Sequence, residues 1–187
     1  QLKQGDVLRS VAHHGSIPYM PIGEVRSITR GRVTGRAVLD GKQIHVHDLQ
    51  EASDEYPEGS AFAQEMGTRT SLVTPLLRDG TAIGTIFIRR REVRPFSDKQ
   101  LALVKTFADQ AVIAIENVRL FNETKEALER QTATAGILKV MAGSPTDVQP
   151  VFDVIVESAV RLCGARFGRV YRYDGSVIHI VASHGLG

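Results

Sequence analysis

The sequence predicts an α+β protein in which an antiparallel sheet is flanked by helices and followed by one long helix. Short segments alternate apolar and polar residues, as half-buried strands do, and turn dipeptides separate them. A capping box at Ser97 to Gln100 opens an apolar pattern of helical period that meets no proline before Pro145. Residues 5–15 and 175–185 also repeat one pattern, which indicates a duplicated unit.

Composition indicates a folded segment without a membrane helix. The chain has 187 residues, of which 42% are hydrophobic, which is enough for one domain or one and a half. No stretch approaches the roughly 20 apolar residues of a membrane helix, and we recognise no secretory signal. The single cysteine, Cys163, excludes an intramolecular disulfide and favours a cytoplasmic location. The net charge of +2, with interspersed signs, gives no reason to expect a nucleic-acid partner.

The repeat indicates how the chain is organised. Gly5 to Gly15 resembles Gly175 to Gly185, and both alternate apolar residues until a His-Gly pair. An apolar helix from Val148 to Cys163 and a strand from Gly168 to Tyr173 precede the second copy. We expect the first copy to lack both elements.

The segment between the two copies should contain most of the sheet. We expect short helices at residues 31–39 and 59–66, and strands at residues 43–47, 70–77 and 82–89. Asp79-Gly80 should join the last two strands as a tight hairpin, because these residues tolerate positive backbone angles.

The long helix that begins at Ser97 exceeds what one small sheet can cover, so its second half should pair with another helix or bridge two domains. Apolar residues at seven-residue spacing form a weak seam whose alternate positions are polar. The seam consists of Ile113, Leu120, Ala127, Thr134 and Met141, alternating with Asn117, Thr124, Gln131 and Leu138. Either a homodimer through this seam or a marginal linker helix fits the pattern.

Several motifs, in order, resemble the GAF domain family. They are Ser71-Leu72-Val73-Thr74-Pro75-Leu76, Asp79-Gly80, Ile83-Gly84-Thr85-Ile86, Arg94-Pro95-Phe96-Ser97, Phe107-Ala108-Asp109-Gln110-Ala111 and Ala114-Ile115-Glu116-Asn117. Residues 44–49 resemble the preceding strand and its loop aspartate. The connector around residues 131–145 is similar to the link between tandem GAF domains in bacterial sensor histidine kinases of two-component systems.

The resemblance implies an antiparallel sheet of about six strands with helices on both faces, and a ligand pocket between the sheet and residues 15–70. On this basis residues 1–121 form a first GAF domain without its opening helix and first strand. Residues 122–146 form a connecting helix and linker, and residues 147–187 start a second repeat. A missing inner strand would leave backbone groups unpaired. We therefore expect residues 148–173 to complete the first domain, within one chain or by exchange in a domain-swapped dimer.

Polar candidates for the pocket are His13, His14, Asp48, Arg69 and Thr70. Each has an alternative structural role: Asp48 could cap a turn, and Thr70 could pair across strands. No ligand or cofactor is identified. The arginine run at residues 89–91 fits a solvated strand end, or an anion contact.

Other chemistry is less well supported by the sequence. His45, His47 and Asp48 could bind a metal, but a solvated strand face explains them better. Cys163 is expected to be a buried packing residue. We recognise no phosphate-binding glycine loop, nucleophile elbow or HExxH helix, so we expect no catalysis within these residues.

The sequence therefore predicts a cytoplasmic sensory module. It would bind a small molecule or partner and relay its state through a dimeric helix to an output domain, such as a histidine kinase. The alternatives are a structural dimerisation module without ligand and a small redox enzyme, because some GAF proteins reduce free methionine sulfoxide with several cysteines.

Overall fold

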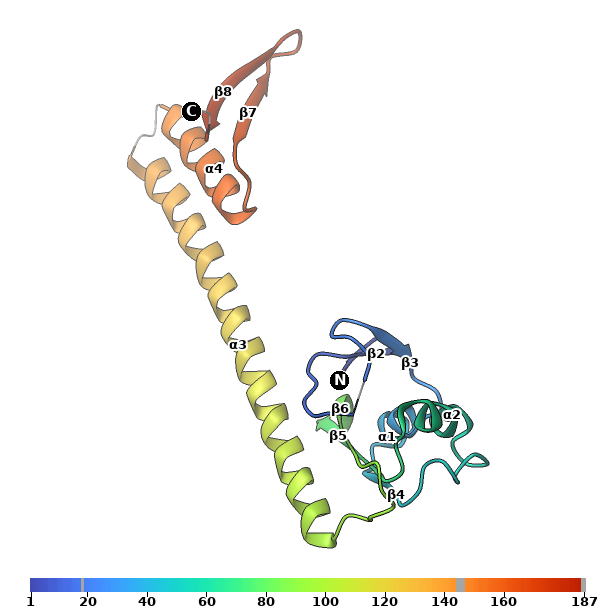
Figure 1. The fold of residues 1–187 in the computed structure, drawn as a ribbon. Coiled ribbons are helices and arrows are strands. Elements are labelled where there is room, and N and C mark those ends of the chain that lie inside the picture. The colour runs from blue at the N-terminus through green and yellow to red at the C-terminus, as the bar shows by residue number, and fades with distance from the viewer. Residues whose placement is uncertain (18, 144–146, 186–187) are drawn as a thin grey trace. The chain divides into compact units, whose positions relative to one another are not determined.

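The computed structural model describes residues 1–17, 19–143 and 147–185 (Figure 1). The chain divides into two compact units, Gln1–Glu116 and Asn117–Gly187, and each is described by itself. Their boundary falls within the long helix α3 (Asp98–Gly143), which was expected to belong to the first domain up to residue 121. Within the described ranges, no helix is both long and apolar enough to cross a membrane.

The first unit contains a six-stranded antiparallel sheet, as expected, in the order β3-β2-β1-β6-β5-β4. The strands are β1 (Leu2–Gln4), β2 (Val7–Arg9), β3 (Val25–Ser27), β4 (Ile44–Val46), β5 (Ser71–Arg78) and β6 (Thr81–Arg89). The turn between β5 and β6 holds Asp79 at φ 49° and Gly80 at φ 77°, which confirms the predicted Asp-Gly hairpin. Both of its strands lie inside the sheet, and β5 is buried from Ser71 to Leu76.

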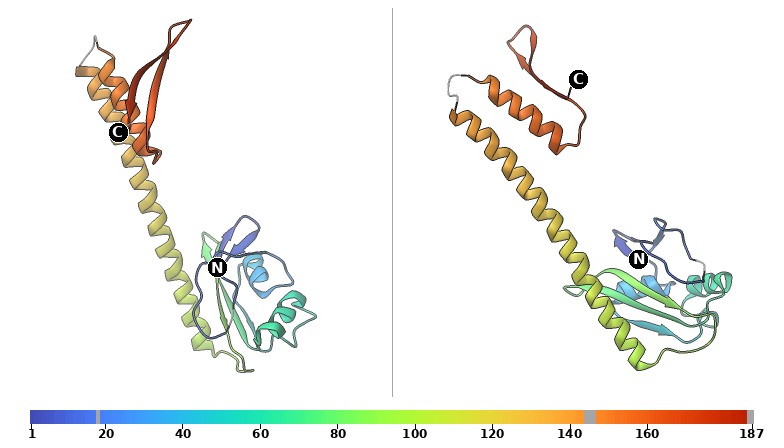
Figure 2. Two further views of the ribbon diagram at one scale, coloured as in Figure 1. Left: turned by 45° about the horizontal axis from the view of Figure 1, so that its top comes forward. Right: turned by 60° about the vertical axis from the view of Figure 1, so that its left-hand side comes forward.

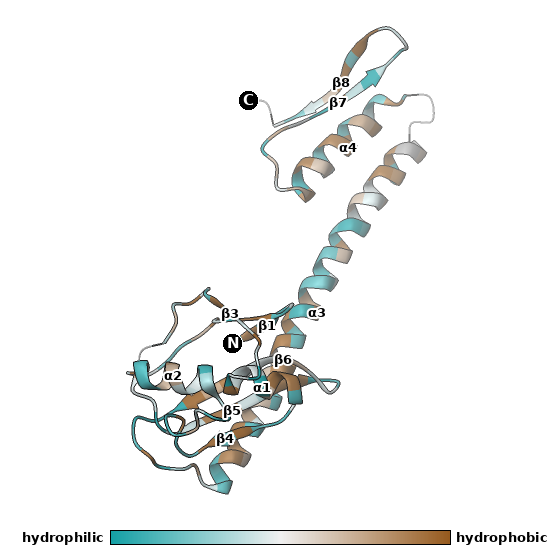
Figure 3. Ribbon diagram, turned by 90° about the vertical axis from the view of Figure 1, so that its right-hand side faces the viewer, coloured by the Kyte–Doolittle hydropathy of each residue, from teal (hydrophilic) through white to brown (hydrophobic). Residues whose placement is uncertain are grey.

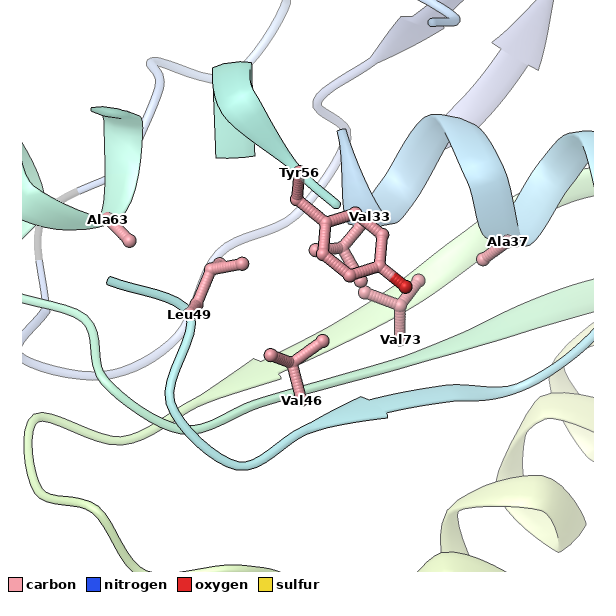
Figure 4. Close-up of a cluster of buried hydrophobic side chains, with 7 residues drawn as sticks. All are labelled: Val33, Ala37, Val46, Leu49, Tyr56, Ala63 and Val73. Atoms are coloured by element: carbon pink, nitrogen blue, oxygen red, sulfur yellow. The ribbon is translucent and has the colours of Figure 1, made fainter. Parts of the chain in front are cut away.

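Helices cover both faces of this sheet (Figure 2). On one face lie α1 (Val33–Asp40) and α2 (Pro57–Met66), both close to the predicted ranges. Their shared core with the sheet is shown in Figure 4, where Tyr56 and Leu49 lie over Val46 and Val73. Each helix ends at a glycine with positive φ, Gly41 or Gly67, the residue that best adopts this left-handed cap.

The N-terminal part of α3 covers the opposite face. Its Val104 is buried with Leu72 and Phe96, and its Ala108 and Val112 are buried with Leu76. At the start of the helix, the Ser97 N–H donates to the Gln100 side chain at 3.1 Å, as the capping box requires. Apolar residues are interspersed with polar ones along the helix beyond the sheet (Figure 3).

The expectation that the first domain lacks its first strand is wrong. The three-residue strand β1 occupies the inner position between β2 and β6, with Leu2 paired to Gly84. The Thr85 N–H donates to the Gln1 carbonyl at 2.9 Å, so backbone groups of β6 find partners along this edge. A strand this short carries no alternation that a sequence pattern could reveal.

The second unit contains the end of α3, α4 (Gln149–Leu162), β7 (Gly168–Tyr173) and β8 (Ile178–His184). The last two strands form a separate two-stranded antiparallel sheet, and α4 buries Val156 and Val160. With β1 in place, the vacancy that motivated strand exchange is absent. Exchange between chains stays a prediction.

Two further expectations need correction in this part of the chain. Cys163 is exposed, because it caps the end of α4 beyond the buried face formed by Val156 and Val160. The repeated strands also differ in length, since β8 extends to His184 whereas β2 ends at Arg9. His14-Gly15 therefore lies in a loop. The predicted connector residues Ser144 and Pro145 and the side chain of Met141 lie outside the described residues.

The close approach of β1 to β6 predicts the effect of a small substitution. A Cβ atom at Gly84 would lie 2.4 Å from the Gln1 carbonyl oxygen, so Gly84→Ala should lower the free energy of unfolding by about 1–3 kcal/mol. Gly136→Ala, in open space on α3, should instead raise stability by about 0.5–1 kcal/mol. Urea denaturation followed by circular dichroism measures both changes, and an unchanged midpoint for Gly84→Ala would contradict the docking of β1.

Candidate functional site

The main cavity of the first unit has a volume of about 370 Å³ and lies between the end of β6 and the loop that follows β2. This volume is in the lower part of the range typical for small-molecule sites. Loop, strand and N-terminal residues line it: Gln1, Ala12, His13, His14, Gly15, Ser16, Ile17, Tyr19, Phe87, Ile88 and Arg89. A much smaller hollow under α1 and α2 shares Tyr19 and Phe87 with it.

Arg89 brings a positive charge to the cavity from the last position of β6. Its guanidinium carbon lies 4.7 Å from the ring centre of Tyr19 and 5.4 Å from that of Phe87. Its Nη atoms also lie 3.5 Å from the Thr68 hydroxyl and 3.4 Å from the Ile17 carbonyl. Burial lowers the pKa of Arg89, but a guanidinium stays charged at neutral pH. The aromatic faces therefore stabilise a partly desolvated cation.

Tyr19 forms the aromatic wall opposite β6. Its ring contacts Phe62 and Phe87 edge to face, with ring centres 5.9 Å and 6.1 Å away. Burial raises the pKa of the phenol, while the charge of Arg89 acts in the opposite direction. The Gln1 side-chain amide donates a hydrogen bond to the Tyr19 hydroxyl. This side chain is therefore held in place by both apolar and polar contacts.

His13 and His14 line the cavity from the loop after β2. The His13 Nε2 donates to the Ile17 carbonyl at 3.0 Å, because a carbonyl oxygen only accepts. Its ring lies 22° from the plane of Tyr19, with the ring centres 6.1 Å apart. These contacts stabilise the loop that forms the rim of the cavity.

The other three candidates, Asp48, Arg69 and Thr70, lie outside the cavity lining and contact the protein itself. Both Asp48 oxygens accept from the Arg69 guanidinium, and one also accepts from the Gln50 N–H at 3.2 Å. The buried Thr70 hydroxyl donates to the His47 carbonyl at 2.7 Å and accepts from the Arg94 N–H at 2.9 Å. These contacts connect the loop after β4 to the one after β6.

His45 has a similar structural contact. Its Nε2 accepts a hydrogen bond from the Phe96 N–H at 3.0 Å, and its ring centre lies 4.8 Å from that of His47. Burial lowers the pKa of His45, with His47 and Arg90 acting in the same direction. Among the residues that the structure describes, no three of His, Cys, Asp and Glu gather as a metal site.

The aromatic lining was missed by the sequence analysis, which named the two histidines as pocket candidates and Arg89 only as part of the arginine run at residues 89–91. Phe87 and Arg89 are two residues apart on a strand, so they project from the same face of the sheet. That alternation was visible in the predicted strand at residues 82–89. The approach of Tyr19 from a loop had no comparable signal.

The ion pair between Asp48 and Arg69 predicts a pH dependence of stability. Hydrogen bonds from Arg69 lower the pKa of Asp48, so the pair stabilises the fold above the ordinary aspartate pKa, and this contribution disappears as the pH falls through the lowered value. Asp48→Asn should therefore destabilise the protein at pH 7 and weaken the loss of stability below about pH 4. Thermal unfolding across pH 2–7 measures this effect. Asp54→Asn, at an exposed carboxylate of the same loop, is the matched control and should leave the pH dependence unchanged. If stability falls with pH in parallel for wild type and Asp48→Asn, the proposed contribution of the ion pair is contradicted.

A model of the GAF domain family matches residues 7–115, which is more than half of the chain. A methyl-accepting chemotaxis protein (residues 122 to 287) shares 24% sequence identity with a TM-score of 0.55, covering 64% of this chain and 77% of that chain. The GAF domain of a two-component sensor histidine kinase from Bacillus halodurans shares 21% identity with a TM-score of 0.47, covering 55% and 68%.

The type II free methionine-R-sulfoxide reductase from Thermoplasma acidophilum is 20% identical, with a TM-score of 0.37 and coverage of 46% of this chain. The chain spans 56% of the reductase's length. At these identities, the likeness to solved structures concerns the fold alone. The extent of the family match, together with the six-stranded sheet between two helical layers, shows that the chain belongs to the GAF domain family.

Proposed function

We propose that this GAF domain is a sensory module that binds a small molecule in the cavity beside β6 and transmits its occupancy to α3. The observation that carries the proposal is that β6 contributes residues both to the cavity and to the packing of α3. Phe87, Ile88 and Arg89 line the cavity, and Ile88 packs together with Ile86 into the clusters that hold α3. A ligand that moves the end of β6 would therefore act on the packing of this helix.

The second part of the proposal is that two copies pair through α3. In the second unit, Ala133 of α3 is buried, whereas Asn117, Leu120, Thr124 and Ala127 are exposed. In the first unit, Ile113 is likewise 61% exposed, while Val112 is buried against the sheet. The seam side chains that the structure describes, from Ile113 to Leu138, are thus exposed, and Phe121 adds an exposed apolar side chain beside them.

Polar residues within the seam would keep two arrangements of the paired α3 helices close in free energy. Asn117 and Thr124 weaken a coiled coil while they fix its register. A ligand that prefers one arrangement then shifts the population by its difference in affinity. We propose that the output is a histidine kinase or a similar signalling domain of a bacterial two-component protein. We assign the module to the cytoplasm, supported by its single cysteine.

These residues, on this proposal, regulate and do not catalyse. Cys163 is exposed and is the single cysteine in the sequence, so a reductase that needs several thiols has no second one here. The competing function is a structural dimerisation module whose cavity stays empty. The exposed seam would support dimerisation in that case too.

Native mass spectrometry tests whether the cavity is a ligand site. The purified chain should carry a discrete extra mass that is lost on denaturation. Ala12→Trp should abolish it, because the indole occupies the cavity that Ala12 lines. Ala61→Trp, at an exposed position of α2, is the matched control and should retain the mass. A chain without extra mass, or equal retention in both variants, would favour the structural module.

A pair of charged substitutions tests the seam. Leu120→Asp should weaken dimerisation at least about tenfold, because it places two like charges in an apolar seam. Val118→Asp introduces the same charge two positions away, on a different face of the helix, at a side chain that is also exposed. Sedimentation velocity should show a dimer for Val118→Asp and mostly monomer for Leu120→Asp. Equal effects of the two substitutions would rule out this seam.

A further inference from the structure

We propose that α3 pairs with the α3 of a second copy in parallel and in register, so that Asn117, Thr124 and Gln131 each face their own counterpart. This inference rests on the proposed function, because it names the orientation and the register of the pairing proposed there. It concerns the part of α3 within the second unit, which begins at residue 117. Three features of this segment carry it: a surface without charge, a polar row at its centre and the charges on its two flanks.

Residues 117–138 of α3 expose a surface that carries no charged side chain. It consists of three neighbouring rows at seven-residue spacing, because residues three and four positions apart adjoin on a helix. The central row is Asn117, Thr124, Gln131 and Leu138, and its neighbours are Leu120, Ala127 and Thr134 on one side and Phe121, Leu128 and Ala135 on the other. All ten side chains are exposed, and the charged residues of the segment lie in other rows. These three rows together are the uncharged surface.

The two outer rows of the uncharged surface supply apolar contact area. Leu120, Phe121 and Leu128 are each at least half exposed. Apolar residues in several adjoining rows are typical of a helix that packs against other helices, because exposure leaves this area in water. The burial of these side chains against a second copy therefore favours association.

The polar residues of the central row match identical residues of a second copy. An amide side chain both donates and accepts hydrogen bonds, and so does a hydroxyl, so Asn117, Thr124 and Gln131 can each pair with their own counterpart. A copy displaced by three or four residues would place these groups opposite Leu120 or Phe121. They would then be buried without partners, which costs free energy. Polar residues at the contact of two helices fix their register in this way.

Glu123 and Lys125 flank the uncharged surface on opposite sides. Glu123 lies in the row beside Leu120, and Lys125 lies in the row beside Phe121. A parallel partner brings unlike flanks together, so an in-register copy has its Lys125 beside Glu123. Within the chain the Glu123 carboxylate accepts from Arg119 at 2.7 Å, and a carboxylate has room for a second donor. The flanks of two parallel copies are therefore complementary in charge.

The same flanks disfavour the alternative pairings. An antiparallel partner brings like flanks together, so a pair centred on Thr124 would place Lys125 beside its own counterpart. A parallel partner shifted by seven residues would place Lys125 beside Arg130, which lies in the row of Glu123. Both contacts join like charges, which disfavours the complex. The parallel, in-register pair avoids both.

Disulfide cross-linking of the full chain tests the orientation and the register. Cys163, which is exposed and is the single native cysteine, is first removed as Cys163→Ser. Asn117→Cys, Thr124→Cys and Gln131→Cys are then introduced one at a time, and each should form a disulfide-linked dimer under mild oxidation. Each should link at least about tenfold faster than the control Glu126→Cys, because Glu126 is exposed on the opposite side of the helix.

The pattern of links identifies any other arrangement. A residue of an antiparallel pair meets its own counterpart at one level only, so a single linking variant would indicate that orientation. A link between Asn117→Cys and Gln131→Cys in a mixture would then confirm it. Dimers in which none of the three variants links faster than Glu126→Cys would indicate a shifted register or another surface. Each of these results would overturn the inference.

Sedimentation velocity of the same variants under reducing conditions separates this inference from the proposed function. Dimers without links in the central row would overturn the inference alone, and Leu120→Asp would still test pairing through α3. Monomers in every variant and in wild type would overturn the inference together with the proposed pairing. Retained mass in native spectra decides independently whether the cavity holds a ligand.

Discussion

The burial of the β5–β6 hairpin on both faces is the constraint on which the rest of the first unit depends. All residues of β5 from Ser71 to Leu76 are buried. Val73 packs under α1 and α2, whereas Leu72 and Leu76 pack against α3. Each such side chain contributes about 1.5–3 kcal/mol when fully buried. The hairpin therefore packs against both helical layers.

This arrangement gives the cavity its connection to α3. Because neighbouring residues move together, a shift of the strand at Arg89 also displaces Ile88, which packs into the cluster that contains Val104 of α3. Tightly packed interiors transmit such shifts because they contain few voids that could absorb them. The same physical element can thus serve as the wall of the binding site and as the support of the signalling helix.

Local signals explain how much of the fold could be predicted from the sequence. The Asp79-Gly80 turn and the capping box at Ser97 act within a few residues, so their elements were found nearly at the observed bounds. The strand β1 was missed because it has one apolar residue in three, and it is held by pairing with a strand some eighty residues later in the chain.

The candidate site was predicted only in part for the same reason. His13 and His14 were found because an alternating strand leads to them. Asp48 and Arg69 were each recognised as polar residues near a loop, but nothing local reveals that they pair with each other. Tyr19 and Arg89 come together across the sheet from distant segments. Tertiary contacts of this kind leave no pattern in either segment alone.

The central claim is that occupancy of the cavity changes α3 through β6. Hydrogen exchange across residues 98–116, recorded for wild type, for Ala12→Trp and for the control Ala61→Trp, measures this most directly, because the indole at position 12 fills the cavity. We predict that Ala12→Trp alters the exchange of these helical amides, whereas Ala61→Trp matches wild type. Identical exchange in all three proteins would contradict the claim, since the cavity would then be filled without any effect on the helix.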